Sequence, residues 1–482
     1  MPIGRREFLK TAFAASVATA YSQQASKPSI VFILADDLGW GDLGCYNDSS
    51  DIPTPNFNKF ASEGMRFTDA HSPSAVCSPT RYGILTGRYC WRSKLTSGVL
   101  WGYSPALIEP GRMTVASMLK QQGYRTAGVG KWHLGLGTAE KTDYSKPLKP
   151  SPIDYGFDSY FGIPASLDMD PYVYIEDDHA VEQATETTPG KNEPRGVFWR
   201  PGPIAPGLKI DQVLPKLTSK AVGFLNGQKG SSQPFFLYLP LTAPHTPWVP
   251  DKKFEGKSKA GIYGDFVVQV DDSIGQVLQA LERSGHAGNT LVIITSDNGA
   301  HWTPDDKRKF AHRANAQWRG MKADIWDAGH RIPFMVRWPG KVKPGSISNE
   351  TICLTDFMAT AAAVTGVKLP ANAGEDSFDI SPVLLGKSNG KPIREAIVHH
   401  SSLGVFSIRQ GPWKLILGLG SGGFSDPKTI EAKAGEATGQ LYNLAKDPHE
   451  STNLYLQEPD VVKRLAGLLE RYKKQGRSRP AG

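Results

Sequence analysis

The chain has 482 residues, of which 39% are apolar and 21% are charged, and its formal net charge is +8. A chain of this length can bury a large core, and two domains are the natural expectation. The ordinary composition, without a low-complexity tract, excludes a disordered or fibrous protein. The positive charge suits an anionic substrate, but no nucleic-acid-binding motif accompanies it, so we expect no nucleic-acid partner.

The first 25 residues are typical of an export signal. Arg5 and Arg6 precede an apolar run at 11–20 that is too short to cross a bilayer. The arginine pair, the apolar run and the small residues at 18–20 resemble a twin-arginine signal. We therefore expect residues 1–25 to be a signal peptide and the mature protein to be bacterial, periplasmic or secreted, without a stable membrane anchor. An uncleaved amphipathic segment is the alternative.

Four uninterrupted apolar runs are predicted to be strands, and each leads into polar residues. The runs are 29–34, 126–129, 234–239 and 290–295, and they lead to Asp36-Asp37, Lys131-Trp132-His133, His245 and Asp297-Asn298. Continuous rather than alternating apolar runs indicate strands buried on both faces of a mainly parallel sheet. Helical patterns at 115–119 and 270–281 lie between them, which predicts a layered α/β fold. Ligands bind such sheets at the carboxyl ends of the strands, where the polar residues fall.

Cys77 stands at the start of a predicted helix. It is followed by Pro79, which suits the first turn of a helix, and by Arg81 one turn later. A helix N-terminus favours an anion, and a guanidinium presents a planar fork to sulfate or phosphate oxygens. A buried structural cysteine is the alternative interpretation.

The other cysteines, Cys45, Cys90 and Cys353, have no metal-ligand spacing. A Cys45–Cys90 disulfide is conceivable, but we favour small buried thiols. Asp36, Asp37, Asp297 and Asn298 offer only oxygen ligands, which suit Ca²⁺ or Mg²⁺ rather than zinc. Each pair alone is also explained by a turn or a helix cap.

The order of these motifs resembles the type I, formylglycine-dependent sulfatases of the alkaline phosphatase superfamily. The resemblance covers most of the chain. It is carried by six segments: Asp36-Asp37, Cys77-Ser78-Pro79-Thr80-Arg81, 123–133 (Gly-Tyr-Arg-Thr-Ala-Gly-Val-Gly-Lys-Trp-His), His245, Asp297-Asn298 and Lys322. Two departures are mild, because Thr80 keeps the hydroxyl of the usual serine and Asp327-Ala328 replaces the usual Glu-Gly.

The resemblance implies a fold and a domain division. It implies a large mixed, mainly parallel central sheet flanked by helices, within a catalytic domain at 26–385. A smaller C-terminal antiparallel sheet plus helix would occupy 386–482. Short apolar runs at 396–400, 404–409 and 413–417 and a helical stripe at 461–472 agree with that subdomain. The polar stretches 137–152 and 177–206 are long enough to suggest walls of a substrate cleft.

The resemblance also implies the chemistry. A formylglycine-generating maturation enzyme would convert Cys77 to 3-oxoalanine, whose hydrate is the nucleophile. Calcium, with Mg²⁺ as the alternative, would be held by Asp36, Asp37, Asp297, Asn298 and the group at position 77. Arg81 would hold the hydrate, and Lys131 and Lys322 would neutralise the sulfate. His245 or Lys322 would protonate the leaving oxygen, and His133 would take the proton from the second hydroxyl of the sulfated hydrate.

Several further residues are candidates for substrate binding, although each is also explained as a surface, turn or packing residue. They are Ser166, which aligns with a family position near the sulfate, and Trp101, His179, His301, Arg313 and His330. The expected function is an exported sulfatase that acts on sulfated carbohydrates, as an exo-enzyme of polysaccharide breakdown. The alternatives are a phosphonate or phosphodiester hydrolase with the same nucleophile, and a non-catalytic protein that binds sulfated glycans.

Overall fold

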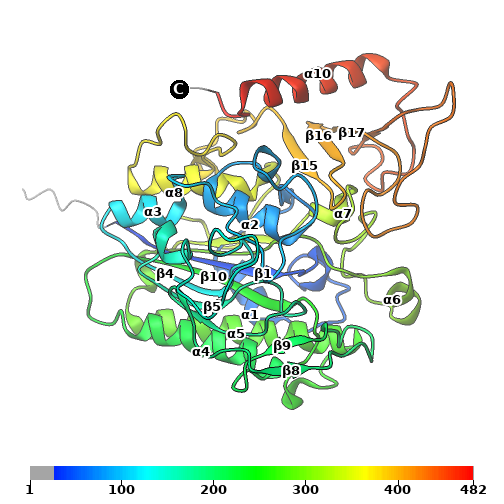
Figure 1. Cartoon of the computed structure of the whole chain (residues 1–482). Coiled ribbons are helices and arrows are strands. Elements are labelled where there is room, and N and C mark those ends of the chain that lie inside the picture. The colour runs from blue at the N-terminus through cyan, green and yellow to red at the C-terminus, as the bar shows by residue number, and fades with distance from the viewer. Residues whose placement is uncertain (1–26, 481–482) are drawn as a thin grey trace, which may run out of the picture.

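The computed structural model describes residues 27–480, so the expected signal peptide at 1–25 lies outside the described residues. The central feature is a ten-stranded sheet in the described part of the chain (Figure 1). Its spatial order is β13 (Ser346–Ser348), β2 (Met65–Phe67), β12 (Phe334–Arg337), β11 (Thr290–Ser296), β1 (Ser29–Asp36), β10 (Phe235–Pro244), β4 (Arg125–Lys131), β5 (Ser159–Ile163), β6 (Ile175–Glu176) and β7 (His179–Ala180).

The middle of the sheet is parallel. Strands β11, β1, β10, β4 and β5 run in one direction, whereas β12 and β6 are antiparallel to their inner neighbours. Strands β1, β10 and β11 are buried along their whole length, as continuous apolar runs predict. The fold class and the four predicted strands are therefore confirmed.

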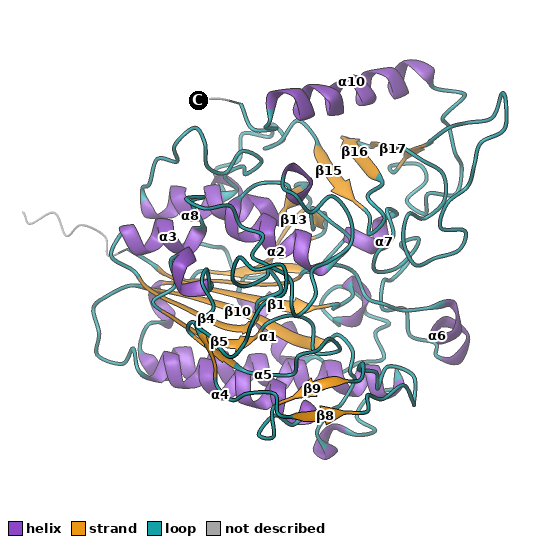
Figure 2. Cartoon of the chain, viewed as in Figure 1, coloured by secondary structure: helices purple, strands orange, loops and turns teal. Residues whose placement is uncertain are grey.

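The helices form a layer on each side of the sheet (Figure 2). One layer contains α1 (Pro55–Glu63), α4 (Val213–Asn226) and α5 (Gly261–Ser284), and the other contains α2 (Cys77–Thr86), α3 (Val115–Gln121) and α8 (Phe357–Thr365). Short helices α6 (Pro304–Lys309), α7 (Asp327–His330) and α9 (Ser381–Leu384) lie in the connections. No helix within residues 27–480 is both long and apolar enough to span a membrane.

A separate four-stranded antiparallel sheet follows near the C-terminus. It consists of β15 (Ile397–His400), β16 (Phe406–Gln410), β17 (Trp413–Ile416) and β18 (Gln440–Asn443), and α10 (Pro459–Gln475) lies against it. The stripe of α10 that the sequence predicts is buried at Leu465, Leu468, Leu469 and Tyr472. Two two-stranded sheets complete the fold: β14 (Ile352–Cys353) with β3 (Ala70–His71), and β8 (Glu186–Thr188) with β9 (Gly202–Ile204).

The register of the parallel strands brings their polar ends together. Asp36 at the end of β1 is paired with Pro244 of β10, the residue before His245. On the other side of β1, Ala35 is paired with Ser296, the residue before Asp297. Near the end of β4, Gly130 has φ +141°, and a Cβ there would lie 1.8 Å from the Pro240 carbonyl oxygen. Glycine is therefore required for β4 to approach β10 closely enough to bring Lys131 to the site.

Candidate active site

Cys77 is the first residue of α2, as the sequence predicts. The residue is buried, and its Sγ lies 3.6 Å from Oδ1 of Asp36. Burial raises the pKa of the Cys77 thiol, although Lys131 and Lys322 oppose this effect. The unmodified side chain is therefore a protonated thiol and a weak nucleophile.

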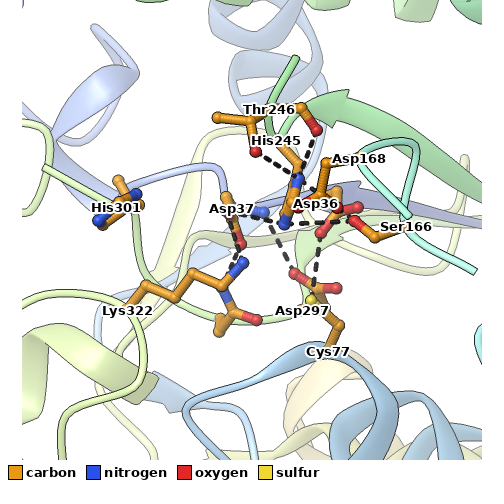
Figure 3. Close-up of polar contacts among 12 residues, drawn as sticks. Asp36, Asp37, Cys77, Ser166, Asp168, His245, Thr246, Asp297, His301 and Lys322 are labelled. Carbon is orange, nitrogen blue, oxygen red and sulfur yellow. Dashed lines mark hydrogen bonds and ion pairs between the residues drawn. The ribbon is translucent and has the colours of Figure 1, made fainter. Parts of the chain in front are cut away.

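Three buried carboxylates gather beside Cys77 (Figure 3). Asp36 and Asp37 come from the end of β1, and Asp297 comes from the end of β11. Each carboxylate has a basic partner. Lys131 Nζ lies 2.6 Å from Asp36 Oδ2, Lys322 Nζ lies 2.8 Å from Asp37 Oδ2, and Arg81 Nη2 lies 2.7 Å from Asp297 Oδ2.

These partners decide the charge of each carboxylate. Burial acts to raise the pKa of Asp36, but Lys131, His245 and Arg81 together hold it below its ordinary value. Burial likewise opposes ionisation of Asp37, but Lys322 and His245 lower its pKa. The pKa of Asp297 is raised, by burial and then by the neighbouring Asp36 charge. The acidic groups are thus close enough to repel one another.

The donor set fits a hard divalent cation. Asn298 is fully buried, and its Oδ1 has no hydrogen-bond partner among residues 27–480, while its Nδ2 donates to Asp37 Oδ1 at 2.7 Å. Three carboxylates and an unpartnered amide oxygen are the chemistry that Ca²⁺ or Mg²⁺ prefers. Ligand atoms of a partly different set, Asp36, Asp37, Cys77 and His245, also lie within 4.8 Å of one another.

Lys131, Ser166 and His245 form a connected group at the edge of the acidic cluster. Lys131 Nζ donates to Ser166 Oγ at 3.2 Å, and that oxygen lies 3.3 Å from His245 Nε2. His245 Nδ1 donates to the Thr246 carbonyl oxygen at 2.6 Å. Its Nε2 is then directed toward Asp37 Oδ2, 3.7 Å away.

His133 lies in a loop after β4 with φ +57°, a conformation that non-glycine residues adopt rarely. It is buried, and its Nε2 lies 2.7 Å from the Leu100 carbonyl oxygen. Burial, followed by the charges of Lys131 and Arg81, lowers the pKa of His133 well below its ordinary value. The imidazole is therefore neutral at neutral pH.

A cavity of about 870 Å³ opens onto these groups. Asp37, Cys77, His133, His245 and Lys322 lie on its wall. Other lining residues come from the loop at 192–200 and from the C-terminal part of the chain, at Ser402 and Phe424. The stretch 177–206 therefore lines the pocket as expected, whereas no residue of 137–152 does.

The structure brings together some of the predicted substrate-binding residues. Ser166, Trp101 and His301 line the pocket. Trp101 is 51% exposed, and the His301 ring packs edge-on against Phe424 at 5.5 Å between centroids. Burial and the charges of Arg195 and Lys322 lower the pKa of His301 to about 4, so its ring is neutral.

Three other candidates lie away from the pocket. His179 in β7 is exposed and lies 2.5 Å from Asp178, and Arg313 donates to carbonyl groups of its own loop. His330, by contrast, is fully buried at the end of α7. The local sequence does not distinguish these residues from pocket residues. His179 and Arg313 follow polar residues and His330 follows a glycine, as residues in a binding loop also do.

His330 belongs to a buried chain of hydrogen bonds between the two sheets. Lys414 Nζ donates to His330 Nε2 at 3.1 Å, and the Nδ1 atoms of His330 and His71 are 3.0 Å apart. His71 Nε2 then meets Asp69 Oδ1 at 3.0 Å. Arg409 Nη1 also lies 3.1 Å from His71 Nε2, and the Ile325 carbonyl oxygen lies 3.2 Å from His330 Nε2. Burial lowers the pKa of both histidines, so both rings are neutral at neutral pH. His399 stacks on His330 with centroids 3.6 Å apart.

Sequence reasoning missed Asp168, Arg195, Phe198, Arg200 and Phe424 among the lining residues. All five lie in loops. The length of the 177–206 stretch indicated a role for Arg195, Phe198 and Arg200, whereas no signal in the sequence marked Asp168 or Phe424. The four cysteines within the described residues are unpaired, so the disulfide alternative is not observed.

Comparison with known proteins identifies the family. The model of the Sulfatase family matches residues 28–367. An N-acetylgalactosamine-6-O-sulfatase from Bacteroides thetaiotaomicron is 35% identical over 94% of this chain and 94% of its own length. Arylsulfatase A from Homo sapiens is 33% identical over 94% of this chain and 87% of its own length.

The fold agrees with these relatives. A solved structure from work on the metabolism of multiple glycosaminoglycans by Bacteroides thetaiotaomicron is similar with a TM-score of 0.81 at 34% identity, covering 93% of this chain and 100% of that one. The resemblance seen in the sequence is thereby confirmed. The chain belongs to the sulfatase family, and it is a sulfuric ester hydrolase.

Proposed function

We propose that this sulfatase is exported and hydrolyses sulfate esters of carbohydrates, using formylglycine made from Cys77 and a bound calcium ion. The observation that carries the proposal is the position of Cys77, at the N-terminus of α2 and 3.6 Å from a carboxylate of the acidic cluster. Carbohydrate is supported by the 35% identical relative, which is named for N-acetylgalactosamine 6-sulfate chemistry, and by the size of the pocket. Export rests on the twin-arginine pattern in residues 1–25.

Conversion of Cys77 is supported by the residues around it. The Cys-Ser-Pro-Thr-Arg segment resembles the family's maturation signature, and a maturation enzyme would act on it as a partner. As a thiol, Cys77 is protonated in this environment and poorly suited to attack sulfur. A formylglycine hydrate would offer two hydroxyl groups on one carbon, of which one can attack and the other can later lose its proton.

Asp36, Asp37, Asp297 and Asn298 would hold the cation. In the described structure three carboxylates face three basic side chains, so the cluster alone carries little net charge. A bound Ca²⁺ would supply Lewis-acid polarisation of a sulfate oxygen and a fixed orientation for the nucleophile. The added positive charge would be balanced by the anionic ester, which favours substrate binding after the cation is bound.

The basic residues divide the remaining work. Lys131 and Lys322 would neutralise sulfate oxygens, and Arg81 would hold the group at position 77. Their ion pairs with Asp36 and Asp37, beside Cys77, support these roles. Lys322, or His245 when its Nε2 is protonated, would donate a proton to the leaving oxygen. Neutral His133 would accept the proton whose loss expels sulfate and restores the aldehyde.

A panel of esters tests this function. Protein whose Cys77 peptide carries the aldehyde by mass would be incubated with sulfated monosaccharides, sulfated oligosaccharides, a phosphonate ester and a phosphodiester. We expect free sulfate from a sugar ester, with N-acetylgalactosamine 6-sulfate as the first candidate. Turnover of the phosphodiester or phosphonate alone would favour the rival hydrolase, which shares the nucleophile and the cation ligands.

A further inference from the structure

One carboxylate on the pocket wall has an oxygen that no described residue satisfies. Asp168 is 5% exposed and lines the pocket. Its Oδ2 accepts from Arg200 Nη1 at 2.6 Å, but its Oδ1 is buried and has no hydrogen-bond partner within residues 27–480. Burial acts to raise the pKa of Asp168, but His245 and Arg200 hold it below its ordinary value. An ionised, buried oxygen without a donor is costly, so a donor from a ligand would be strongly favoured.

Arg200 fixes the direction of this carboxylate. Its backbone N–H and its Nη1 donate to the Asp168 carbonyl oxygen at 3.2 and 3.0 Å, in addition to the bond to Oδ2. The guanidinium itself lies over the rings of Trp101 and Phe198, 4.9 Å from each centroid. Arg200 thus binds the backbone carbonyl group and Oδ2 of Asp168, and Oδ1 is the side-chain acceptor left for a ligand.

The surroundings of Asp168 suit a sugar ring. Trp101 and Phe198 line the same pocket, and the half-exposed indole of Trp101 offers an apolar face beside the charged acceptor. An aromatic face next to a fixed carboxylate matches a pyranose, which has an apolar C–H face and a rim of hydroxyl donors.

Asp168 also lies close to the reacting groups. It follows Ser166 by two residues, and Ser166 contacts both Lys131 and His245. Figure 3 shows Asp168 beside His245, on the side of the acidic cluster away from Lys322. A sugar whose sulfate ester reaches Cys77 would therefore place a neighbouring part of its ring near Asp168.

We propose that Asp168 is a specificity residue: its Oδ1 accepts a hydrogen bond from a sugar hydroxyl next to the sulfated carbon, while Trp101 packs on the ring. The inference rests on the proposed function, because it requires a sulfated carbohydrate as substrate. In this assignment Asp168, Arg200 and Trp101 recognise the sugar that leaves. Lys131 and Lys322 bind the sulfate group.

The test compares two esters in one protein. Asp168→Asn keeps the shape of the side chain and removes its charge. The variant should lower kcat/KM for the best sulfated monosaccharide of the panel about 10- to 100-fold more than kcat/KM for 4-nitrophenyl sulfate, which has no sugar hydroxyl. Asp178→Asn, at a carboxylate that does not line the pocket, is the matched control and should leave the ratio of the two rates unchanged.

A modified substrate makes the test independent of side effects of the substitution. With the sugar sulfate that lacks the neighbouring hydroxyl, wild type and Asp168→Asn should have nearly equal kcat/KM. Equal losses on the sugar ester and the aryl ester, or a loss that persists with the deoxy sugar, would overturn the proposal. Trp101→Ala provides a second variant and should raise KM for the sugar ester selectively; an unchanged ratio for both variants also contradicts the assignment.

Failure of the proposed function has a different signature. Wild-type protein with the confirmed aldehyde would then release no sulfate from any sugar ester, and only the aryl ester or the phosphodiester would be consumed. If sugar esters are turned over but the Asp168 ratio does not move, the sulfatase function stands and the specificity assignment alone is wrong.

Discussion

His133 Nε2 lies 2.7 Å from the carbonyl oxygen of Leu100. A carbonyl oxygen can only accept, so Nε2 carries the proton and Nδ1 is the basic nitrogen of the neutral ring. Nδ1 is buried and has no partner in the described part of the chain. The backbone N–H of Leu100 in turn donates to Ser78 Oγ at 3.1 Å, next to Cys77. The tautomer of the proposed base is therefore set by a segment that is attached to the helix carrying the nucleophile.

His133→Ala should slow turnover about 10²- to 10⁴-fold, because a positioned base contributes that much to a proton transfer. It should also allow the sulfated form of the group at position 77 to accumulate, since formation of the ester does not use His133. Intact-protein mass after mixing with substrate would detect the adduct. His179→Ala, at an exposed histidine away from the pocket, is the control. A rate loss without any covalent adduct would remove the assigned role.

Calcium should stabilise the folded protein. The cation would bind the folded cluster and not the unfolded chain, so at a concentration 100 times its Kd it should add about 2.7 kcal/mol to the free energy of unfolding. Thermal melting with and without Ca²⁺, after removal of metal by a chelator, measures this shift. Asp297→Asn should reduce the shift, and Asp178→Asn should not. A melting temperature that changes neither when the chelator is added nor when Ca²⁺ is restored would contradict the cation site.

The stability of the protein should fall on mild acidification because of the buried histidines. Burial, followed by the Arg331 charge, lowers the pKa of His71 to about 4, and burial with Lys414 lowers that of His330 well below its ordinary value. Between about pH 6.5 and 4 the unfolded chain binds protons at these sites and the folded chain does not. Stability is therefore fully present above about pH 6.5 and is lost toward pH 4, by on the order of 3 kcal/mol for His71 alone.

Urea unfolding at pH 7 and pH 5 checks this sign. His71→Gln should be less stable at pH 7 and should show a smaller loss between the two pH values than the wild type. His179→Gln removes an exposed histidine by the same substitution and should keep the wild-type loss. Identical pH dependence in the two variants would mean that the buried histidine chain does not control acid stability.

The sequence was sufficient to predict the part of the site that regular structure positions. Asp36, Asp297 and Lys131 follow continuous apolar strands, and the topology of a parallel sheet then brings the strand ends together. Cys77 was equally predictable, because a proline and an arginine at helical spacing mark the start of α2.

The substrate-facing wall could not be predicted in the same way. Asp168 and Arg200 are 32 residues apart in the sequence and are joined by a hydrogen bond between two loops. Phe424 lines the pocket from the C-terminal part of the chain. The backbone N–H groups of Phe424 and Ser425 both donate to Asp324, and this anchoring has no local sequence signal. The prediction that His330 lies near the substrate was wrong for the same reason. His330 is buried against Lys414 and His71, and both residues are distant from it in the sequence.

The most direct test of the central claim measures free sulfate released from N-acetylgalactosamine 6-sulfate. The protein would be a preparation in which mass spectrometry shows the aldehyde at position 77, and the reference would be Cys77→Ala at equal concentration and with the same folded fraction by circular dichroism. We predict that the converted protein releases many equivalents of sulfate per enzyme molecule and that the variant releases none. Equal sulfate release by the two proteins would contradict the nucleophile at position 77 and with it the mechanism.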